Sequence, residues 1–174
     1  MRPSDAHNEG MRSVRRIEPG PGQESVWDYP RPPRVEPSPD RIRIRLGGRA
    51  VVDTTDAVRV LETSHPPVYY VPREAVTAEL SPAPGSSLCE FKGAARYLTI
   101  EAGGRREEAA GWYYPDPAPG YEALAGRVAV YPSRMDECEV SGETVQPQEG
   151  DFYGGWITSK VVGPFKGAAG TLGW

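Results

Sequence analysis

Two lysines stand in a pentapeptide that the chain uses twice. The sequence Phe-Lys-Gly-Ala-Ala occurs at residues 91–95 and again at 165–169, while the flanking residues do not repeat. The chain has seventeen Arg and only three Lys, and two of these three lysines, Lys92 and Lys166, lie in the repeated pentapeptide. An ammonium is more compact than a guanidinium, and its pKa shifts readily on burial. We therefore expect both loops to face one cleft, where these lysines hold an anionic group or act as a nucleophilic amine.

A purely structural interpretation of the pentapeptides stays open. Gly93 and Gly167 would then relieve backbone strain in two similar turns. Each Lys would extend from a buried Phe to solvent, or would hydrogen-bond to the last carbonyls of its turn. In the functional interpretation, Lys92 is a candidate catalytic residue, and Lys166, Gly93 and Gly167 are candidate ligand-binding residues.

Cys89 and His65 are the two further candidates for catalysis. Cys89 precedes Lys92 by three residues, and a nearby ammonium favours the reactive thiolate. The alternative is a small, buried, inert cysteine. His65 lies in a turn before two prolines, where an imidazole could act as a general base. A capping or surface histidine is the alternative there.

Aromatic residues could supply the walls of a pocket. Tyr70, Tyr97 and Trp112 are the candidates that we assign to ligand binding, because their rings combine an apolar body with a polar group. Three tyrosines beside them could join the same wall or, like them, be core residues and cross-strand pairs. These additional tyrosines are Tyr69, Tyr113 and Tyr114.

The sequence does not predict a metal site or a cofactor. Cys89 and Cys138 form no C-x-x-C pair, and the only histidines are His7 and His65, so a structural zinc would lack protein ligands. The chain has no run of 18 apolar residues and no hydrophobic signal region at its N-terminus. We expect a soluble cytoplasmic protein without a membrane partner, in which both cysteines are thiols; a disulfide between them is the alternative.

Charge is distributed unevenly along the chain. The formal net charge is −4, yet residues 1–49 carry ten Arg against seven acidic residues, which leaves residues 50–174 strongly acidic. Binding to a phosphate backbone requires a basic surface. We therefore expect a small molecule, not a nucleic acid, as the partner of the acidic body, while the oligomeric state stays open.

Composition predicts many turns and short strands. The chain has 20 Gly and 19 Pro in 174 residues, with 38% hydrophobic residues, which favours a mainly β fold with little helix. Residues 41–46 alternate Arg with Ile or Leu, and Gly47-Gly48 predicts a hairpin to residues 50–52. We expect the three arginines to form a solvated edge, with a phosphate-binding stripe as the alternative. The further predicted strands are 57–61, 68–71, 94–100, 109–114 and 127–131, with a polar loop at 81–87 and a helical turn at 121–125.

The chain length suits one domain. We expect residues 1–23 to be a disordered arm, because they contain almost nothing to bury. Residues 24–174 would form a single β-rich domain. It would start with a Pro-rich segment anchored by Trp27 and Tyr29 and end in a packed tail. The alternative for the Pro-rich segment is a recognition motif.

Several motifs resemble a known family. They are Trp27 with Arg31-Pro32-Pro33, residues 63–72 (TSHPPVYYVP), 89–97 (CEFKGAARY), 112–115 (WYYP), 126–131 (GRVAVY), and the later segments 155–157 (GWI) and 163–167 (GPFKG). Together they are similar to the bacterial domain of unknown function 427, in a longer form with extensions at both ends. The resemblance implies a compact antiparallel β structure, barrel-like or tent-like. It implies zinc cysteines as well, and these are missing here.

The family is also catalogued as nucleotidyltransferase-like. That chemistry needs a Gly-Gly or Gly-Ser turn followed by a closely spaced pair of acidic metal ligands. Here Gly47-Gly48 is followed by Asp53 and Asp56, whose spacing does not place both on one strand face. We therefore expect a small-molecule-binding β domain, which could be an enzyme acting on an anionic metabolite. A non-catalytic ligand- or peptide-binding module and a structural or interaction protein are the alternatives.

Overall fold

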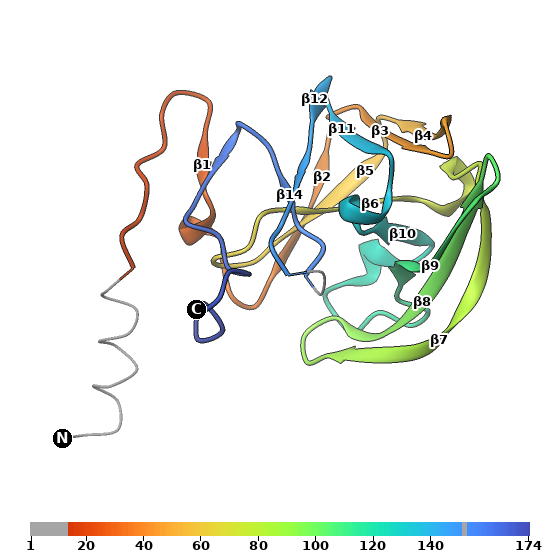
Figure 1. The fold of residues 1–174 in the computed structure, drawn as a ribbon. Coiled ribbons are helices and arrows are strands. Elements are labelled where there is room, and N and C mark those ends of the chain that lie inside the picture. The colour runs from red at the N-terminus through yellow and green to blue at the C-terminus, as the bar shows by residue number, and fades with distance from the viewer. Residues whose placement is uncertain (1–13, 151–152) are drawn as a thin grey trace.

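A computed structural model describes residues 14–150 and 153–174 of the chain. The described residues are mainly β, and all but one of their strand pairs are antiparallel, so the predicted fold class is confirmed (Figure 1). Helical structure is limited to four single 3-10 turns, which are η1 (Val26–Asp28), η2 (Arg73–Ala75), η3 (Glu122–Leu124) and η4 (Pro132–Arg134). None of the helices in the described residues is long and apolar enough to cross a membrane.

The larger of two principal sheets has seven strands. Their spatial order is β2 (Arg34–Ser38), β5 (Ala57–Leu61), β6 (Val68–Pro72), β10 (Arg127–Val130), β9 (Arg105–Tyr113), β8 (Gly93–Ala102) and β7 (Glu79–Cys89). The sheet is open, so the barrel-like closure was a wrong expectation. Both edge strands contain prolines, Pro37 in β2 and Pro82 and Pro84 in β7, and proline cannot donate a hydrogen bond to a further strand.

The smaller sheet has four strands and lies against one face of the larger one. Its order is β12 (Glu143–Thr144), β11 (Glu137–Val140), β3 (Ile42–Leu46) and β4 (Arg49–Thr54). The alternating residues of β3 point Ile42, Ile44 and Leu46 into the core at 1% exposure or less. Gly47 and Gly48 both have positive φ, and this confirms the predicted hairpin.

The two faces of the seven-stranded sheet support different cores. On β6, Tyr69 and Val71 pack into the cluster between the sheets, whereas Tyr70 points to the opposite face and joins Trp112 and Tyr114 there. This is the period-2 alternation of a β-strand. The face away from the small sheet therefore carries a wall of aromatic residues.

One predicted loop was wrong, because residues 81–87 belong to the long edge strand β7. Strand β8 extends far enough to pair with it, from Glu79↔Glu101 to Cys89↔Gly93. The polar and Pro-rich composition is accommodated by a shift in register between Pro82 and Ser86, where Gly85 has positive φ. The bulge lets a segment with poor strand propensity remain in the sheet.

The two terminal segments pack against each other beside the large sheet. Strand β1 (Glu24–Ser25) pairs in parallel with β15 (Val161–Val162), and β13 (Gln146–Pro147) pairs with β14 (Trp156–Ile157). Trp27 donates from Nε1 to the Pro164 carbonyl at 2.9 Å, and both Trp27 and Tyr29 are buried, as predicted. The tail also packs as predicted at Trp156 and Val161, although Leu172 is 81% exposed.

The predicted disordered arm covers residues 1–23, of which 1–13 lie outside the described residues. Within the described part, Val14 packs beside the cluster of Val26 and Trp27. The Ile17 amide donates to the Gly163 carbonyl at 3.0 Å, and the Gln23 side chain donates to the Ser159 carbonyl at 2.8 Å. Contacts with the C-terminal segment therefore begin before the boundary that we predicted at residue 23.

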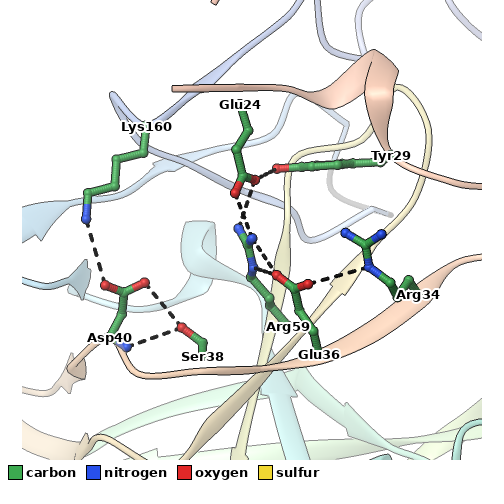
Figure 2. Close-up of polar contacts among 8 residues, drawn as sticks. All are labelled: Glu24, Tyr29, Arg34, Glu36, Ser38, Asp40, Arg59 and Lys160. Atoms are coloured by element: carbon green, nitrogen blue, oxygen red, sulfur yellow. Dashed lines mark hydrogen bonds and ion pairs between the residues drawn. The ribbon is translucent and has the colours of Figure 1, made fainter. Parts of the chain in front are cut away.

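A set of polar side chains, in two separate hydrogen-bonded or ion-paired groups, connects the terminal segments to β2, β5 and the loop after β2 (Figure 2). We call it the terminal clasp; it consists of Glu24, Tyr29, Arg34, Glu36, Ser38, Asp40, Arg59 and Lys160. At its centre, Arg59 donates to Glu24 at 2.8 Å and to Glu36 at 2.7 Å. Hydrogen bonds from Arg59 lower the pKa of Glu24 below its ordinary value. At the clasp's edge, Lys160 lies 3.8 Å from Asp40.

Candidate functional site

A cavity of about 310 Å³ opens on the aromatic face of the seven-stranded sheet. Seven of the nine side chains and glycines that we singled out from the sequence line it: His65, Tyr70, Cys89, Lys92, Tyr97, Trp112 and Lys166. The remaining lining residues are Val60, Glu62, Pro66, Val68, Ser87, Leu88, Tyr114, Tyr131 and Tyr153. Residues far apart in the sequence thus surround one space.

Three separate segments form the rim of this cavity, above a floor of sheet residues. The end of β7 and the turn into β8 supply Cys89 and Lys92. The connection between β5 and β6 supplies His65, and the C-terminal segment supplies Tyr153 and Lys166. The structure therefore brings both pentapeptide lysines to the same cavity, as the shared motif led us to expect.

The two lysines of the cavity contact aromatic rings and not carboxylates. The Nζ of Lys92 lies 6.0 Å from the ring centre of Tyr114, and the Nζ of Lys166 lies 5.6 Å from that of Tyr153. Among residues 14–150 and 153–174, neither ammonium has an acidic oxygen within 4.0 Å, in contrast to Lys160 with Asp40. Ring faces attract a cation only weakly compared with an opposite charge. The cavity therefore holds two ammonium groups that form no ion pair with a described residue, while its lining carboxylate, Glu62, pairs with Arg31 instead.

The glycines of the pentapeptides shape the backbone and do not line the cavity. Gly93 has φ +108° and Gly167 has φ +133°, a region that side chains with a Cβ rarely adopt. A Cβ on Gly167 would lie 1.9 Å from the Glu149 carbonyl oxygen. Both turns are also tied to neighbouring loops, since the Lys92 carbonyl accepts from Ala118 and the Lys166 amide donates to Ser64, each at 2.9 Å. The glycines of the pentapeptides therefore have the structural role that we considered, and the lysines line the cavity.

His65 is partly buried on the rim and has a polar neighbour on each ring nitrogen. Its Nδ1 lies 3.2 Å from the Gln148 side-chain nitrogen, and its Nε2 lies 3.4 Å from a Glu62 oxygen. Burial, followed by the charges of Lys166, Arg31 and Lys92, lowers the pKa of His65 to about 4. The imidazole is therefore neutral at physiological pH and can accept a proton.

The aromatic floor is a connected set of rings. Trp112 donates from Nε1 to the Tyr70 hydroxyl at 3.1 Å, and its ring centre lies 4.6 Å from that of Tyr131. Burial raises the pKa of Tyr70 above its ordinary value, so its hydroxyl stays protonated at neutral pH. Tyr70 and Trp112 are buried, so the partly exposed Tyr131 is the ring of this set that a ligand could reach.

The two cysteines occupy different environments. Cys89 is partly exposed in the cavity, whereas Cys138 is 2% exposed in the core between the sheets. Burial raises the pKa of the Cys138 thiol, which makes it unreactive. Both are thiols and not a disulfide. Within the described part of the chain, no three His, Cys, Asp or Glu side chains are grouped to hold a metal ion.

Sequence reasoning missed several cavity residues. Tyr131 is partly buried and packs on Trp112. Glu62 and Tyr153 lie in irregular segments without a motif, and Gln148, which lies beside the cavity without lining it, follows the two-residue strand β13. The alternation of β6 is a signal that could have sorted its two tyrosines, because Tyr70 faces the cavity while Tyr69 packs between the sheets.

Comparison with protein-family models identifies a match for most of the domain. A family model described as "Domain of unknown function (DUF427)" matches residues 34–141 of the chain. No curated protein matches the chain. The matched region includes Cys89, Lys92 and His65, whereas Tyr153 and Lys166 lie beyond it.

Proposed function

The chain belongs to the family of domain of unknown function 427, and we propose that its cavity binds a small organic anion. The observation that carries this proposal is the convergence of Lys92 and Lys166, which are 74 residues apart in the sequence, on a cavity where neither pairs with a carboxylate among the described residues. A partly buried charge without a counter-charge is unfavourable. An anionic ligand would supply the missing charge.

The aromatic floor supports an organic ligand in preference to a bare inorganic ion. Ligand sites typically combine apolar walls with a few polar groups, and they span about 300 to 1,000 Å³. The cavity has about 310 Å³, at the lower end of that range. The partly exposed rings of Tyr97 and Tyr131, backed by the buried Tyr70 and Trp112, would contact the apolar part of the ligand while the lysines contact its charge.

The composition of the chain supports a location and a class of partner for this proposed function. A reducing cytoplasm would keep Cys89 and Cys138 as the thiols seen in the structure. The acidic charge of residues 50–174 disfavours nucleic acid as the partner. We therefore propose a cytoplasmic protein with a small-molecule partner.

Lysine substitutions test the proposal directly. Native mass spectrometry of the purified chain first identifies a co-purifying molecule, and benzoate and phenyl phosphate serve as probe anions whose binding is followed by isothermal titration calorimetry. Lys92→Met and Lys166→Met should each weaken anion binding by about 2 to 5 kcal/mol, since the replacement keeps the apolar stem and removes the charge. Lys92→Arg and Lys166→Arg should also weaken it, because a broad guanidinium does not fit a site shaped for an ammonium.

Lys160→Met is the matched control, because Lys160 belongs to the terminal clasp. Its binding should equal that of the wild type. Wild-type binding by all four cavity variants would contradict the proposal, as would the failure of every anion, including any co-purified molecule, to bind the unmodified protein.

Catalysis is the second candidate function, favoured by the presence of Cys89 and His65 in the same cavity as Lys92. A thiol is a candidate nucleophile, and His65 could serve as its general base only after its Nδ1 gives up the contact with Gln148. Cys89 should react with iodoacetamide much faster than Cys138, and a bound anion should protect it. Cys89→Ser should retain anion binding while it loses any turnover of the co-purified molecule; equal reactivity of the two thiols would argue against this candidate.

A further inference from the structure

Gln148 is a buried carboxamide beside the cavity, 5% exposed, and both of its polar atoms are engaged. Its Nε2 donates to the Lys166 carbonyl at 2.7 Å, and its Oε1 accepts from the Gly155 amide at 3.1 Å. A carbonyl can only accept and a backbone amide can only donate. The orientation of the carboxamide is therefore fixed by two independent partners.

This orientation determines the state of His65. The Nε2 of Gln148 also lies 3.2 Å from the Nδ1 of His65. Since this nitrogen can only donate, Nδ1 must accept, and the imidazole proton must reside on its Nε2. The Nε2–H then faces Glu62, whose oxygen lies 3.4 Å away.

The same carboxamide also fixes the loop that carries Lys166. The carbonyl of Lys166 is held by Gln148, and its amide donates to Ser64, the residue before His65. Tyr153, from the same C-terminal segment, places its ring centre 5.2 Å from that of His65 and 5.6 Å from the Lys166 Nζ. All three of these C-terminal residues lie beyond the region matched by the family model.

We infer that Gln148 is a positioning residue that holds His65 as the neutral Nε2–H tautomer and sets Lys166 in place, so that the C-terminal segment governs anion binding by the cavity. The part that concerns binding rests on the proposed function, whereas the part that concerns the tautomer does not. Besides Gln148, the charged and titratable groups that act on His65 are Glu62 on the neighbouring turn, Arg31 of the Pro-rich segment, Lys92 of the β7–β8 turn, and Tyr153 and Lys166 of the C-terminal segment.

The test is an NMR measurement of the ring nitrogens in the full chain. The sequence contains only two histidines, His7 and His65, so ¹⁵N-histidine labelling gives two imidazoles, and His7→Asn assigns them. At pH 7.5 the His65 ring should show a protonated Nε2 and an unprotonated Nδ1. A wild-type ring protonated on Nδ1 would overturn the inference without any variant of Gln148.

Gln148→Glu places an acceptor and a negative charge beside Nδ1 while the side-chain shape is kept. The tautomer should change to Nδ1–H or the ring should become cationic, and the His65 titration midpoint should rise by at least about one pH unit. Gln146→Glu is the matched control, because Gln146 is exposed on β13 two residues away and receives the same charge. An unchanged tautomer and midpoint in Gln148→Glu would also overturn the inference.

Phenyl phosphate then separates the two parts. Its affinity should fall at least about tenfold in Gln148→Glu and stay unchanged in Gln146→Glu. If the His65 tautomer changes in Gln148→Glu while the affinity does not, the role of the C-terminal segment in binding is wrong. If Lys92→Met and Lys166→Met also bind as the wild type does, the proposed function fails while the tautomer assignment stands.

Discussion

The terminal clasp and the cavity both contain lysines of the chain, but these lysines have different partners in the two regions. In the clasp, Arg59 bonds two carboxylates and Lys160 pairs with Asp40 (Figure 2). In the cavity, the ammonium groups of Lys92 and Lys166 contact rings. Three lysines of one chain therefore fall into two classes, defined by the presence or absence of a counter-charge among the described residues.

This difference indicates what each region is for. Ion pairs within a protein stabilise one arrangement of its segments, and their removal is felt in the free energy of unfolding. A charge without an internal partner contributes little to folding and is available to a ligand. Clasp substitutions should therefore change stability, whereas cavity substitutions should change binding.

Removal of Arg59 should have the largest effect on stability. Its side chain is 17% exposed and lies between Glu24 and Glu36, so Arg59→Met leaves Glu24 without its ion-pair partner and Glu36 with only the exposed Arg34. We expect the free energy of unfolding in urea to fall by about 2 to 4 kcal/mol, with anion binding by the folded protein unchanged. Arg34→Met is the control, because Arg34 is 57% exposed and 3.5 Å from Glu36; it should cost less than about 1 kcal/mol. Equal stability of Arg59→Met and the wild type would contradict the claim that the clasp stabilises the fold.

Acid should destabilise the cavity through His65. The folded-state pKa is about 4 and the unfolded-state value is about 6.5, so the unfolded chain binds a proton that the folded protein does not. The stability contributed by the neutral imidazole is complete above pH 6.5 and is lost as the pH falls to 4. By pH 5 the loss should be about 2 kcal/mol.

The measurement is the free energy of unfolding at pH 7.5 and pH 5. His65→Gln should remove most of the difference between the two, whatever its effect at pH 7.5. The hydrogen bonds from Arg59 lower the pKa of Glu24, so that clasp carboxylate stays charged in this window. A pH dependence that survives in His65→Gln would assign the acid sensitivity to other groups.

Local patterns predicted the hairpin and the cavity lysines, but not what surrounds them. The alternation of residues 41–46 and the pair Gly47-Gly48 specify strand and turn within a few residues. The pentapeptide marked Lys92 and Lys166 because Lys is rare in this chain. Neither signal depends on how distant segments pack.

Features that depend on distant segments could not be predicted in the same way. Residues 81–87 form a strand because β8 offers a partner, although their own propensity is that of a loop. Gln148 carries no motif, and its role comes from Lys166, Gly155 and His65, which converge on it. The clasp likewise exists only because Glu24 of the N-terminal segment meets Arg59 of β5 and Lys160 of the C-terminal segment meets Asp40.

Lys166→Met tests whether a cavity lysine contributes to stability. No carboxylate pairing is lost among the described residues, so the free energy of unfolding at pH 7.5 should change by less than about 1 kcal/mol. Lys166 is the first of the charges that lower the His65 pKa, and its removal should raise that pKa. The stability lost between pH 7.5 and pH 5 should therefore shrink, and Lys92→Met should show a smaller shift in the same direction. A loss above about 2 kcal/mol at pH 7.5 would reveal an internal partner for Lys166.

Lys160→Met should have the smallest effect on stability. The Lys160 side chain is 58% exposed and 3.8 Å from Asp40, and an exposed pair contributes less than about 0.5 kcal/mol. Asp40 also keeps its hydrogen bonds from the Ser38 and Ser141 hydroxyls, which limits the loss further. The same substitution at all three lysines thus distinguishes the two regions. Lys160→Met should slightly lower the stability in urea and leave the anion affinity unchanged. At the cavity lysines, the substitution should greatly reduce the affinity while the stability stays nearly constant. If Lys160→Met weakened anion binding as much as Lys166→Met, the effect would come from the net charge of the protein, and the distinction between the clasp and the cavity would not hold.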